Sequence, residues 1–336
     1  MEWQYCKEML PKVSRTFALN IVKLKGKTCE AVTISYLLFR IADTFEDNLF
    51  LKEDEKIKAL EQIRWIFEGN KCLNERLNLY ESLKFQWKQS SYEKELVENG
   101  DKVLKCYFDL LPIYRSIIDP LISESVEGMA KFQKRKLESS LKIFQLQDLK
   151  DLEEYCYYVA GIVGIMLTRI FSLKKSISKI KTQLEKYQVQ FGLALQLTNI
   201  LKDWQKDLNR GWCYLPYAIT NKWQINLEDS ISPNQQIGII KDIIPWILTY
   251  FDSALKYIEI IPETERSIRL FCIIPFVLAY NTLIYLFKNE DKVPRKKVSE
   301  ILEISNSFAN SNQLLKKDYL RVKKYVTVHR RDTEMI

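Results

Sequence analysis

The chain has 336 residues, of which 47% are hydrophobic and 28% charged, and its formal net charge is +8 at pH 7. This composition excludes a disordered polypeptide and is sufficient for a sizeable core. His329 is the only histidine in the sequence. Its isolation excludes catalysis by Ser-His-Asp or Cys-His groups and argues against a Cys/His metal site.

The N-terminal segment MEWQYCKEML lacks the apolar stretch of a secretory signal. The seven cysteines form no CxxC pair, and an odd number of unpatterned thiols is typical of a reducing compartment. The most apolar run, 157–168, is well short of the roughly 20 residues that a membrane span needs. We therefore expect a cytoplasmic protein without a signal peptide or transmembrane segment.

Apolar residues recur with a period near 3.6 along most of the chain, which predicts helices. The segments with this pattern are 36–47, 53–68, 100–117, 148–173, 179–207 and 236–260. Asn-Gly at 99–100 lies between helical flanks and predicts a helix–helix turn, and Leu-Pro at 215–216 predicts the end of a long helix. Glycine and proline are few and scattered, and no repeat or linker is visible. The sequence predicts an all-α fold in a single domain, 1–336.

The segment YLLFRIADTFED at 36–47 combines apolar residues with charges. On a helix, Tyr36, Arg40, Asp43 and Asp47 are spaced 4, 3 and 4 apart and share one face, which Glu46 borders. Burying unpaired charges costs several kcal/mol or more, so this face either meets water or binds a ligand.

A second acidic face is predicted within 193–207, LALQLTNILKDWQKD. Gln196, Asn199, Asp203 and Asp207 are spaced 3, 4 and 4 apart and again share one helix face. A lone DxxxD usually marks a solvated face. Here, however, both patterns interrupt strongly apolar helices, which favours two carboxylate faces that meet in a helical bundle.

Facing carboxylates in a bundle suit a hard divalent cation. Mg²⁺ prefers oxygen ligands, retains several waters, and is typically held by one or two carboxylates together with substrate phosphate. Arg40 and Lys202 lie beside the carboxylates in the sequence and could pair with a diphosphate. The pattern therefore indicates metal-assisted departure of a diphosphate.

Residues 316–331 (KKDYLRVKKYVTVHRR) contain seven lysines or arginines and one aspartate. This segment fits either a solvated helix end or weak peripheral contact with an anionic surface, such as a membrane, through the basic C-terminal segment 316–336. No nucleic-acid motif accompanies it, and we expect no nucleic-acid partner.

Several motifs, in order along most of the chain, resemble the squalene/phytoene synthase family of head-to-head isoprenyl transferases, and squalene synthases in particular. They are SRTFAL (14–19), YLLFRIADTFED (36–47), EGMAKF (127–132), YCYYVAGIVG (155–164), QLTNILKDWQKDLNRGWCYLP (196–216), RLFCIIPFVLAYNTL (269–283) and KVPRKKV (292–298). The resemblance implies an isoprenoid-synthase-type helical bundle with a central substrate channel, Mg²⁺, and prenyl diphosphate substrates. We expect the protein to be a monomer.

The resemblance also implies roles for individual residues. Metal binding falls to the two acidic faces, that is, to Asp43, Glu46, Asp47, Asn199, Asp203 and Asp207. Diphosphate binding falls to Ser14, Arg15, Thr16, Phe17, Tyr36, Arg40, Gln196 and Lys202. Tyr155 matches the tyrosine that handles the proton in the first half-reaction, although an ordinary core tyrosine is an alternative interpretation. Lys292 and Arg295 are the candidates for the NADPH phosphates.

Three positions depart from the family pattern. Lys202 stands where arginine is common, which keeps the charge but loses the bidentate fork. Trp212 and Phe276 stand where arginine and glutamine are frequent, and they leave the product and the reductant site open. A non-catalytic assembly factor would be expected to have lost the two acidic faces, and a basic surface-binding protein would show no Mg²⁺-dependent turnover.

The implied reaction joins two farnesyl diphosphates into presqualene diphosphate, which NADPH then reduces to squalene. Dehydrosqualene, phytoene or presqualene diphosphate remains the alternative product if no reductive step follows. The sequence contains no GxGxxG fingerprint, so NADPH would have to bind in the channel.

Overall fold

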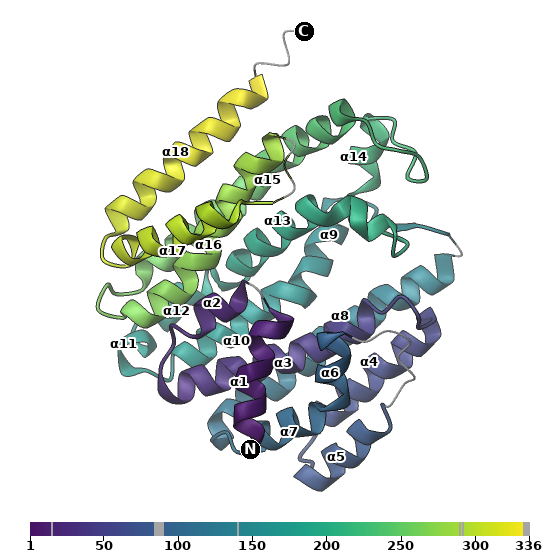
Figure 1. Ribbon diagram of the computed structural model, residues 1–336, viewed down its shortest axis with the longest axis vertical. Coiled ribbons are helices and arrows are strands. Elements are labelled where there is room, and N and C mark those ends of the chain that lie inside the picture. Colours follow the sequence, from purple (N-terminus) through teal and green to yellow (C-terminus); the bar gives the residue numbers. More distant parts are fainter. Residues whose placement is uncertain (15, 84–90, 140, 289, 291, 332–336) are drawn as a thin grey trace. The chain divides into compact units, whose positions relative to one another are not determined.

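The computed structural model describes residues 1–14, 16–83, 91–139, 141–288, 290 and 292–331. The helices of the N-terminal half are α1 (Glu2–Val13), α2 (Phe17–Ile21), α3 (Gly26–Glu46), α4 (Glu53–Phe67), α5 (Leu73–Glu81), α6 (Tyr92–Glu98), α7 (Gly100–Phe108) and α8 (Pro112–Ser139). After them come β1 (Phe144–Gln145), α9 (Leu149–Cys156), the π-helix η1 (Tyr157–Gly161), α10 (Ile162–Phe171), α11 (Lys175–Ser178), α12 (Lys181–Glu185) and α13 (Gln188–Leu208). The remaining elements are β2 (Trp212–Cys213), α14 (Tyr217–Lys222), α15 (Pro233–Ile260), α16 (Arg266–Phe287), α17 (Arg295–Phe308) and α18 (Asn312–Arg331). The predicted all-α class is confirmed (Figure 1).

The chain divides into two compact units. Unit 1 comprises Met1–Leu141 and Ile165–Leu173, and unit 2 comprises Lys142–Gly164 and Lys174–Ile336. The first acidic face belongs to unit 1 and the second to unit 2. That the chain forms a single domain, and that the two faces meet across a central channel, therefore stay predictions.

Unit 1 is built around α3, which packs against α1, α4, α6, α7 and α8, while α4 lies along α8 (Figure 1). The apolar side of α3 is almost inaccessible to solvent: Leu37 and Phe45 are fully buried and Ile41 is 2% exposed. Burial of such side chains contributes about 1.5–3 kcal/mol each. This apolar side holds the helix in place, so that its polar face is presented at a defined position.

Unit 2 is built around α13, which packs against α9, η1, α15 and α16. The close approach of η1 and α10 to α13 depends on two glycines. A Cβ at Gly164 would collide with the carbonyl oxygen of Gln188, and one at Gly192 with that of Ala160. The absence of a side chain at Gly164 and Gly192 thus admits the neighbouring backbone.

The helix boundaries differ from the prediction in three places. The predicted helix over 100–117 is interrupted, because Pro112 has no N–H and begins α8. The predicted helix over 179–207 is divided between α12 and α13. Finally, α13 ends at Leu208 rather than at 215–216, and Gly211 (φ 72°) then leads into β2, which pairs in parallel with β1. The turn at 99–100 is confirmed, because Asn99 ends α6 and precedes α7.

Among the described helices, α16 is the one long and apolar enough to pass as a candidate membrane span. It has a mean hydropathy of 2.1, but 72% of its most apolar window is buried inside the protein. A buried core helix can meet the same criteria of length and hydropathy, so these criteria alone are weak evidence for a membrane span.

Candidate active site

The N-terminal substrate-binding candidates lie beside the first acidic face of unit 1. The Tyr36 hydroxyl donates to the Val13 carbonyl oxygen at 3.3 Å, and its ring lies 5.7 Å from that of Phe17. The backbone N–H of Phe17 donates to Ser14 Oγ at 3.0 Å, and Thr16 is the N-cap of α2. Ser14 and Phe17 therefore lie beside Tyr36, and Thr16 precedes the helix that begins with Phe17. Their role in substrate binding stays a prediction. Arg15 lies outside the described residues.

Arg40 is the cation of this first face. Its Nη2 donates to Glu93 Oε1 at 3.2 Å, whereas its Nη1 lies 4.0 Å from Asp43 Oδ2. Burial acts to lower the pKa of Arg40, but the charges of Asp43, Tyr36 and Glu93 and the hydrogen bond to Glu93 raise it above its usual value. The guanidinium is therefore a permanent positive charge, 29% exposed, next to the acidic face.

The three carboxylates of α3 differ in their exposure. Asp43 is 39% exposed and Asp47 is the exposed C-cap of the helix. Glu46 is only 4% exposed, close to the equally buried Lys56 of α4. Burial and the charge of Lys136 lower the pKa of Lys56, while Glu53, Asp47 and Glu46 act in the opposite direction. Asp43 and Asp47 are thus the more accessible metal-ligand candidates, and the supporting role of Glu46 stays a prediction.

The second acidic face lies on α13 in unit 2. Gln196 is half-buried, Asn199 is exposed, Asp203 is 33% exposed and Asp207 is 7% exposed. Both carboxylates are paired with cations of their own helix end: Asp203 with Lys202 at 3.0 Å and with Lys206, and Asp207 with Arg210 at 2.5 Å.

The lysines keep Asp203 ionised. Burial raises the pKa of Asp203, but the hydrogen bonds and charges of Lys206 and Lys202 outweigh that effect, and the pKa lies below its usual value. Lys202, the departure from the family's arginine, is therefore held by the neighbouring carboxylate. A diphosphate could compete for the same ammonium group, because Lys acts as a point charge rather than a fork.

The carboxylates of α3 and α13 are suitable donors for Mg²⁺, although within the described ranges they do not form a closed cage of protein ligands. In the part of the chain that the structure describes, no three or more His, Cys, Asp or Glu side chains gather closely enough to form a metal site. Mg²⁺ does not require such a cage, because it is usually bound through one or two carboxylates plus phosphate and water. Asp43 with Asp47, and Asp203 with Asp207, each supply such a pair of hard oxygen donors one helical turn apart.

Tyr155 lies in a buried aromatic stack of unit 2. Its hydroxyl donates to the Tyr214 hydroxyl at 3.1 Å, and the two rings stack with centroids 4.6 Å apart. Trp212 continues the stack on the other side of Tyr214, at 5.3 Å and an interplanar angle of 12°, and meets the Phe144 ring edge-on. The Tyr155 hydroxyl therefore has a second phenol as its hydrogen-bonding neighbour.

The structure gives the other two departures from the family pattern a packing explanation. Trp212 is 2% exposed within the aromatic stack. Phe276 is fully buried and contacts the rings of Phe251, Tyr280 and Tyr319. Both positions hold core aromatics, which a charged or amide side chain could not replace without losing these contacts.

The two NADPH candidates are exposed. Lys292 precedes α17, and Arg295 is its first residue. The contacts of the described residues do not connect them with Tyr155 or with the acidic face of α13, so their assignment stays a prediction.

Three kinds of residue at the candidate site were not predicted from the sequence. Glu93 pairs with Arg40 across 53 positions, which no spacing rule could reveal. Lys206 and Arg210 neutralise the carboxylates of α13 at i+3, a spacing that could have been recognised. Tyr214, within the quoted motif ending in YLP, could be connected to Tyr155 only through the three-dimensional structure.

Residues 10–301 match the family described as Squalene/phytoene synthase. The squalene synthase ERG9 of Saccharomyces cerevisiae is 30% identical over 297 residues, which cover 85% of this chain and 62% of that protein. Squalene synthase 1 of Arabidopsis thaliana is 29% identical over 297 residues, covering 86% of this chain and 66% of that protein. This chain thus spans roughly three fifths to two thirds of the length of these relatives.

Solved structures support the same fold. The ligand complex of TcSQS superposes with a TM-score of 0.76 at 22% identity and covers 99% of both chains. A dehydrosqualene synthase in complex with a ligand has a TM-score of 0.60 at 22% identity, covering 91% of this chain and 96% of that one. The fold class is that of squalene and dehydrosqualene synthases. The chain belongs to the squalene/phytoene synthase family.

Proposed function

We propose that this protein condenses two farnesyl diphosphates head to head into presqualene diphosphate and reduces that intermediate with NADPH to squalene. The observation that carries the proposal is that α3 and α13 both retain carboxylate faces on otherwise buried helices of a family member. The similarity to squalene synthases of yeast and plant supports the choice of product.

In this reaction the first condensation releases one diphosphate and one proton, and the second step releases the other diphosphate. Arg40, Lys202 and Tyr36 would bind the diphosphates, together with Ser14, Thr16, Phe17 and Gln196. Tyr155 would take up the proton, with the Tyr214 hydroxyl as its hydrogen-bonding neighbour. The apolar interior would keep water away from the carbocations.

Two cofactors complete the proposal. Mg²⁺ would be held by Asp43, Asp47, Asn199, Asp203 and Asp207, with Glu46 in support, and it would stabilise the charge of the departing diphosphate. NADPH would supply the hydride, with its phosphates near Lys292 and Arg295. We further propose that the protein acts as a cytoplasmic monomer.

The proposal is tested by incubating the protein with farnesyl diphosphate and Mg²⁺, with and without NADPH, and identifying the products by mass. Squalene that forms only when NADPH is present supports the proposal. A hydrocarbon product that is unchanged by NADPH would overturn the reductive step.

Dehydrosqualene synthesis is the second candidate. It is supported by the structural likeness to a dehydrosqualene synthase and by Phe276, which stands where squalene synthases often have glutamine. The same incubation separates the two candidates. Phytoene synthesis would instead require geranylgeranyl diphosphate as substrate, and a product that stops at presqualene diphosphate would mark a synthase without a second step.

Replacing Tyr155 by Phe is expected to slow the first half-reaction about 10²-fold or more, the usual contribution of a positioned general acid or base. The aromatic stack with Tyr214 would remain, since only the hydroxyl is removed. The rates of presqualene diphosphate formation and of its conversion to squalene are measured separately, with Tyr157→Phe as a control. Equal losses in both half-reactions would contradict the proton role of Tyr155.

The basic C-terminal segment is expected to bind anionic vesicles weakly. Leu315, Tyr319, Val322 and Val326 of α18 are buried against the rest of unit 2. Deleting the helix would therefore expose the core, whereas Lys316, Lys317 and Lys324 are exposed and can be changed without that cost.

Changing these three lysines to Gln is expected to weaken sedimentation with phosphatidylserine-containing vesicles roughly 10²-fold, because each basic residue near such a surface contributes about 1 kcal/mol. Neutral vesicles provide the reference. Unchanged binding to anionic vesicles would mean that α18 is not the attachment surface.

A further inference from the structure

The guanidinium of Arg40 has spare hydrogen-bonding capacity. An arginine side chain has five N–H donors, yet within the described residues this group makes one hydrogen bond, from Nη2 to Glu93 Oε1 at 3.2 Å. Its Nε is buried and has no hydrogen-bond partner among those residues. The Nη1 atom lies 4.0 Å from Asp43 Oδ2, beyond hydrogen-bonding distance. Arg40 is thus held through Nη2, and Nη1 remains for a further acceptor, whereas the buried Nε is enclosed by the protein.

The partner carboxylate is itself firmly placed. Glu93 lies in the first turn of α6, which packs against α1 and α3. Ser91 caps this helix by accepting a hydrogen bond from the Lys94 N–H at 3.1 Å, and the Tyr5 hydroxyl donates to the Glu95 carbonyl oxygen at 3.0 Å. Burial opposes ionisation of Glu93, but a backbone N–H and Arg40 keep its pKa below the usual value. A charged acceptor is therefore fixed at the tip of Arg40.

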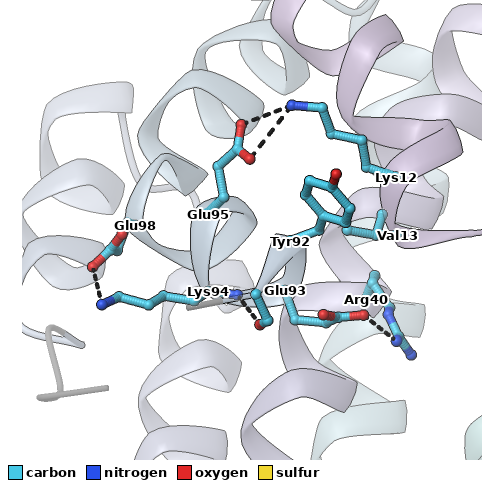
Figure 2. Close-up of a pocket in the computed structure, with 9 residues that line it drawn as sticks. Lys12, Val13, Arg40, Tyr92, Glu93, Lys94, Glu95 and Glu98 are labelled. Carbon is cyan, nitrogen blue, oxygen red and sulfur yellow. Dashed lines mark hydrogen bonds and ion pairs between the residues drawn. The ribbon is translucent and has the colours of Figure 1, made fainter. Parts of the chain in front are cut away.

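Arg40 and Glu93 line a hollow of about 880 Å³ formed by α1, α3 and α6 (Figure 2). Its charged lining is organised as pairs: besides Arg40 with Glu93, Lys12 binds Glu95 at 3.1 Å and Lys94 lies 3.6 Å from Glu98. Ligand sites in proteins commonly have volumes of about 300–1,000 Å³, so this hollow could admit a group such as a diphosphate.

The Arg40–Glu93 pair differs from the two other pairs. Lys12 with Glu95 and Lys94 with Glu98 involve no residue of the acidic face. Arg40, in contrast, shares its helix face with Tyr36, Asp43 and Asp47. The hydrogen bond to Glu93 therefore orients a residue of the candidate diphosphate site.

We propose that Glu93 is a positioning residue that holds the Arg40 guanidinium ready to receive a diphosphate group. This inference rests on the proposed function, which it deepens. A free arginine side chain loses rotamer entropy when it binds an anion, and fixing one end beforehand reduces that loss. The single hydrogen bond to Glu93 leaves Nη1 for an incoming phosphate oxygen.

Binding of inorganic diphosphate with Mg²⁺ to the full chain, measured by calorimetry, tests the inference. Glu93→Ala is expected to weaken binding about tenfold, because the orienting hydrogen bond to a charged group is lost. Glu93→Gln is expected to bind within about threefold of the parent protein, since its amide oxygen still accepts a hydrogen bond from Nη2. Glu61→Ala is the matched control: it breaks the ion pair of Glu61 with Lys134 at 2.6 Å in the same unit, involves no residue that lines the hollow, and is expected to bind diphosphate like the parent protein.

Two sets of results would overturn the inference. One is a Glu93→Ala variant that binds diphosphate as tightly as the parent protein, or more tightly, which would make Glu93 a bystander or a competitor. The other is a Glu93→Gln variant that loses as much as Glu93→Ala, which would make the charge rather than the hydrogen bond decisive. A thermal unfolding curve for each variant separates these effects from loss of the fold.

The proposed function and this inference can be overturned independently, because different measurements test them. Turnover of farnesyl diphosphate by the parent protein tests the function, and the KM of the Glu93→Ala variant tests the inference. An active parent protein whose Glu93→Ala variant keeps an unchanged KM overturns the inference alone. A parent protein that binds diphosphate with the expected dependence on Glu93, yet forms no prenyl product, overturns the function alone. A parent protein that binds no diphosphate overturns the inference.

Discussion

Asp43→Ala and Asp203→Ala are each expected to lower the formation of both presqualene diphosphate and squalene by about 10²–10³-fold or more, because a bound metal contributes several kcal/mol to the transition state and each 1.36 kcal/mol is a factor of ten. Each substitution removes a hard oxygen donor from an acidic face. In the case of Asp203 it also leaves Lys202 and Lys206 without their shared carboxylate.

The loss should affect both half-reactions, since a diphosphate departs in each. This pattern separates Asp43 and Asp203 from Tyr155, whose loss is expected mainly in the first step. Asp54→Ala is the matched control: Asp54 is a half-exposed carboxylate of α4 that pairs with Lys58 at 3.3 Å and is not among the metal-ligand candidates. Products are quantified by mass at several Mg²⁺ concentrations. An Asp203→Ala variant with the activity of the Asp54→Ala control would contradict the metal-binding role of α13.

The sequence was sufficient to predict the helical class and both acidic faces, because these depend on local periodicity. Tyr36, Arg40 and Asp43 repeat at helical spacing among apolar residues, and such a pattern has few alternatives once the segment is helical. Helix ends were predicted less well. The break before Pro112 follows from proline chemistry, whereas the break between α12 and α13 has no comparable signal.

The partners of the site residues could not be predicted, because they come from distant parts of the chain. Arg40 meets Glu93 and Tyr155 meets Tyr214 only after the helices have packed. Whether a carboxylate is exposed, as for Asp43, or buried, as for Glu46, likewise depends on neighbouring helices such as α4. Helix periodicity indicates which residues share a face but not what lies opposite that face.

Arg269 is the first residue of the motif RLFCIIPFVLAYNTL, but the motif does not reveal what this residue does. The structure gives it a structural role in unit 2: it is fully buried, and among the described residues its guanidinium donates only to oxygens at helix ends. Its acceptors are the carbonyl oxygens of Ile258, Ile261, Phe308 and Ala309 and the side-chain oxygen of Asn312. One side chain therefore donates to the last carbonyls of both α15 and α17. The carbonyls of Ile258 and Phe308 also accept a backbone N–H, from Ile261 and Ser311.

Replacing Arg269 by Met is expected to lower the free energy of unfolding by about 3–5 kcal/mol, the usual cost of leaving several buried polar groups without their charged partner. Thermal unfolding followed by circular dichroism should show a midpoint lower by about 5–10 °C. Arg269→Lys is expected to rescue little of this loss, since an ammonium group cannot reproduce the planar fork that reaches both helix ends.

Arg266 provides the matched control for this prediction. It lies one turn earlier on α16 and donates to the carbonyl and side-chain oxygens of Asn306 on α17, at 3.3 and 3.0 Å, but it is exposed. Water can replace those hydrogen bonds, so Arg266→Met is expected to cost no more than about 1 kcal/mol. If Arg269→Met melted like Arg266→Met but lost turnover at low temperature, Arg269 would act in the reaction rather than in joining the ends of α15 and α17. If it instead melted early and kept its turnover while folded, the stability of this helix junction would rest on a single buried cation.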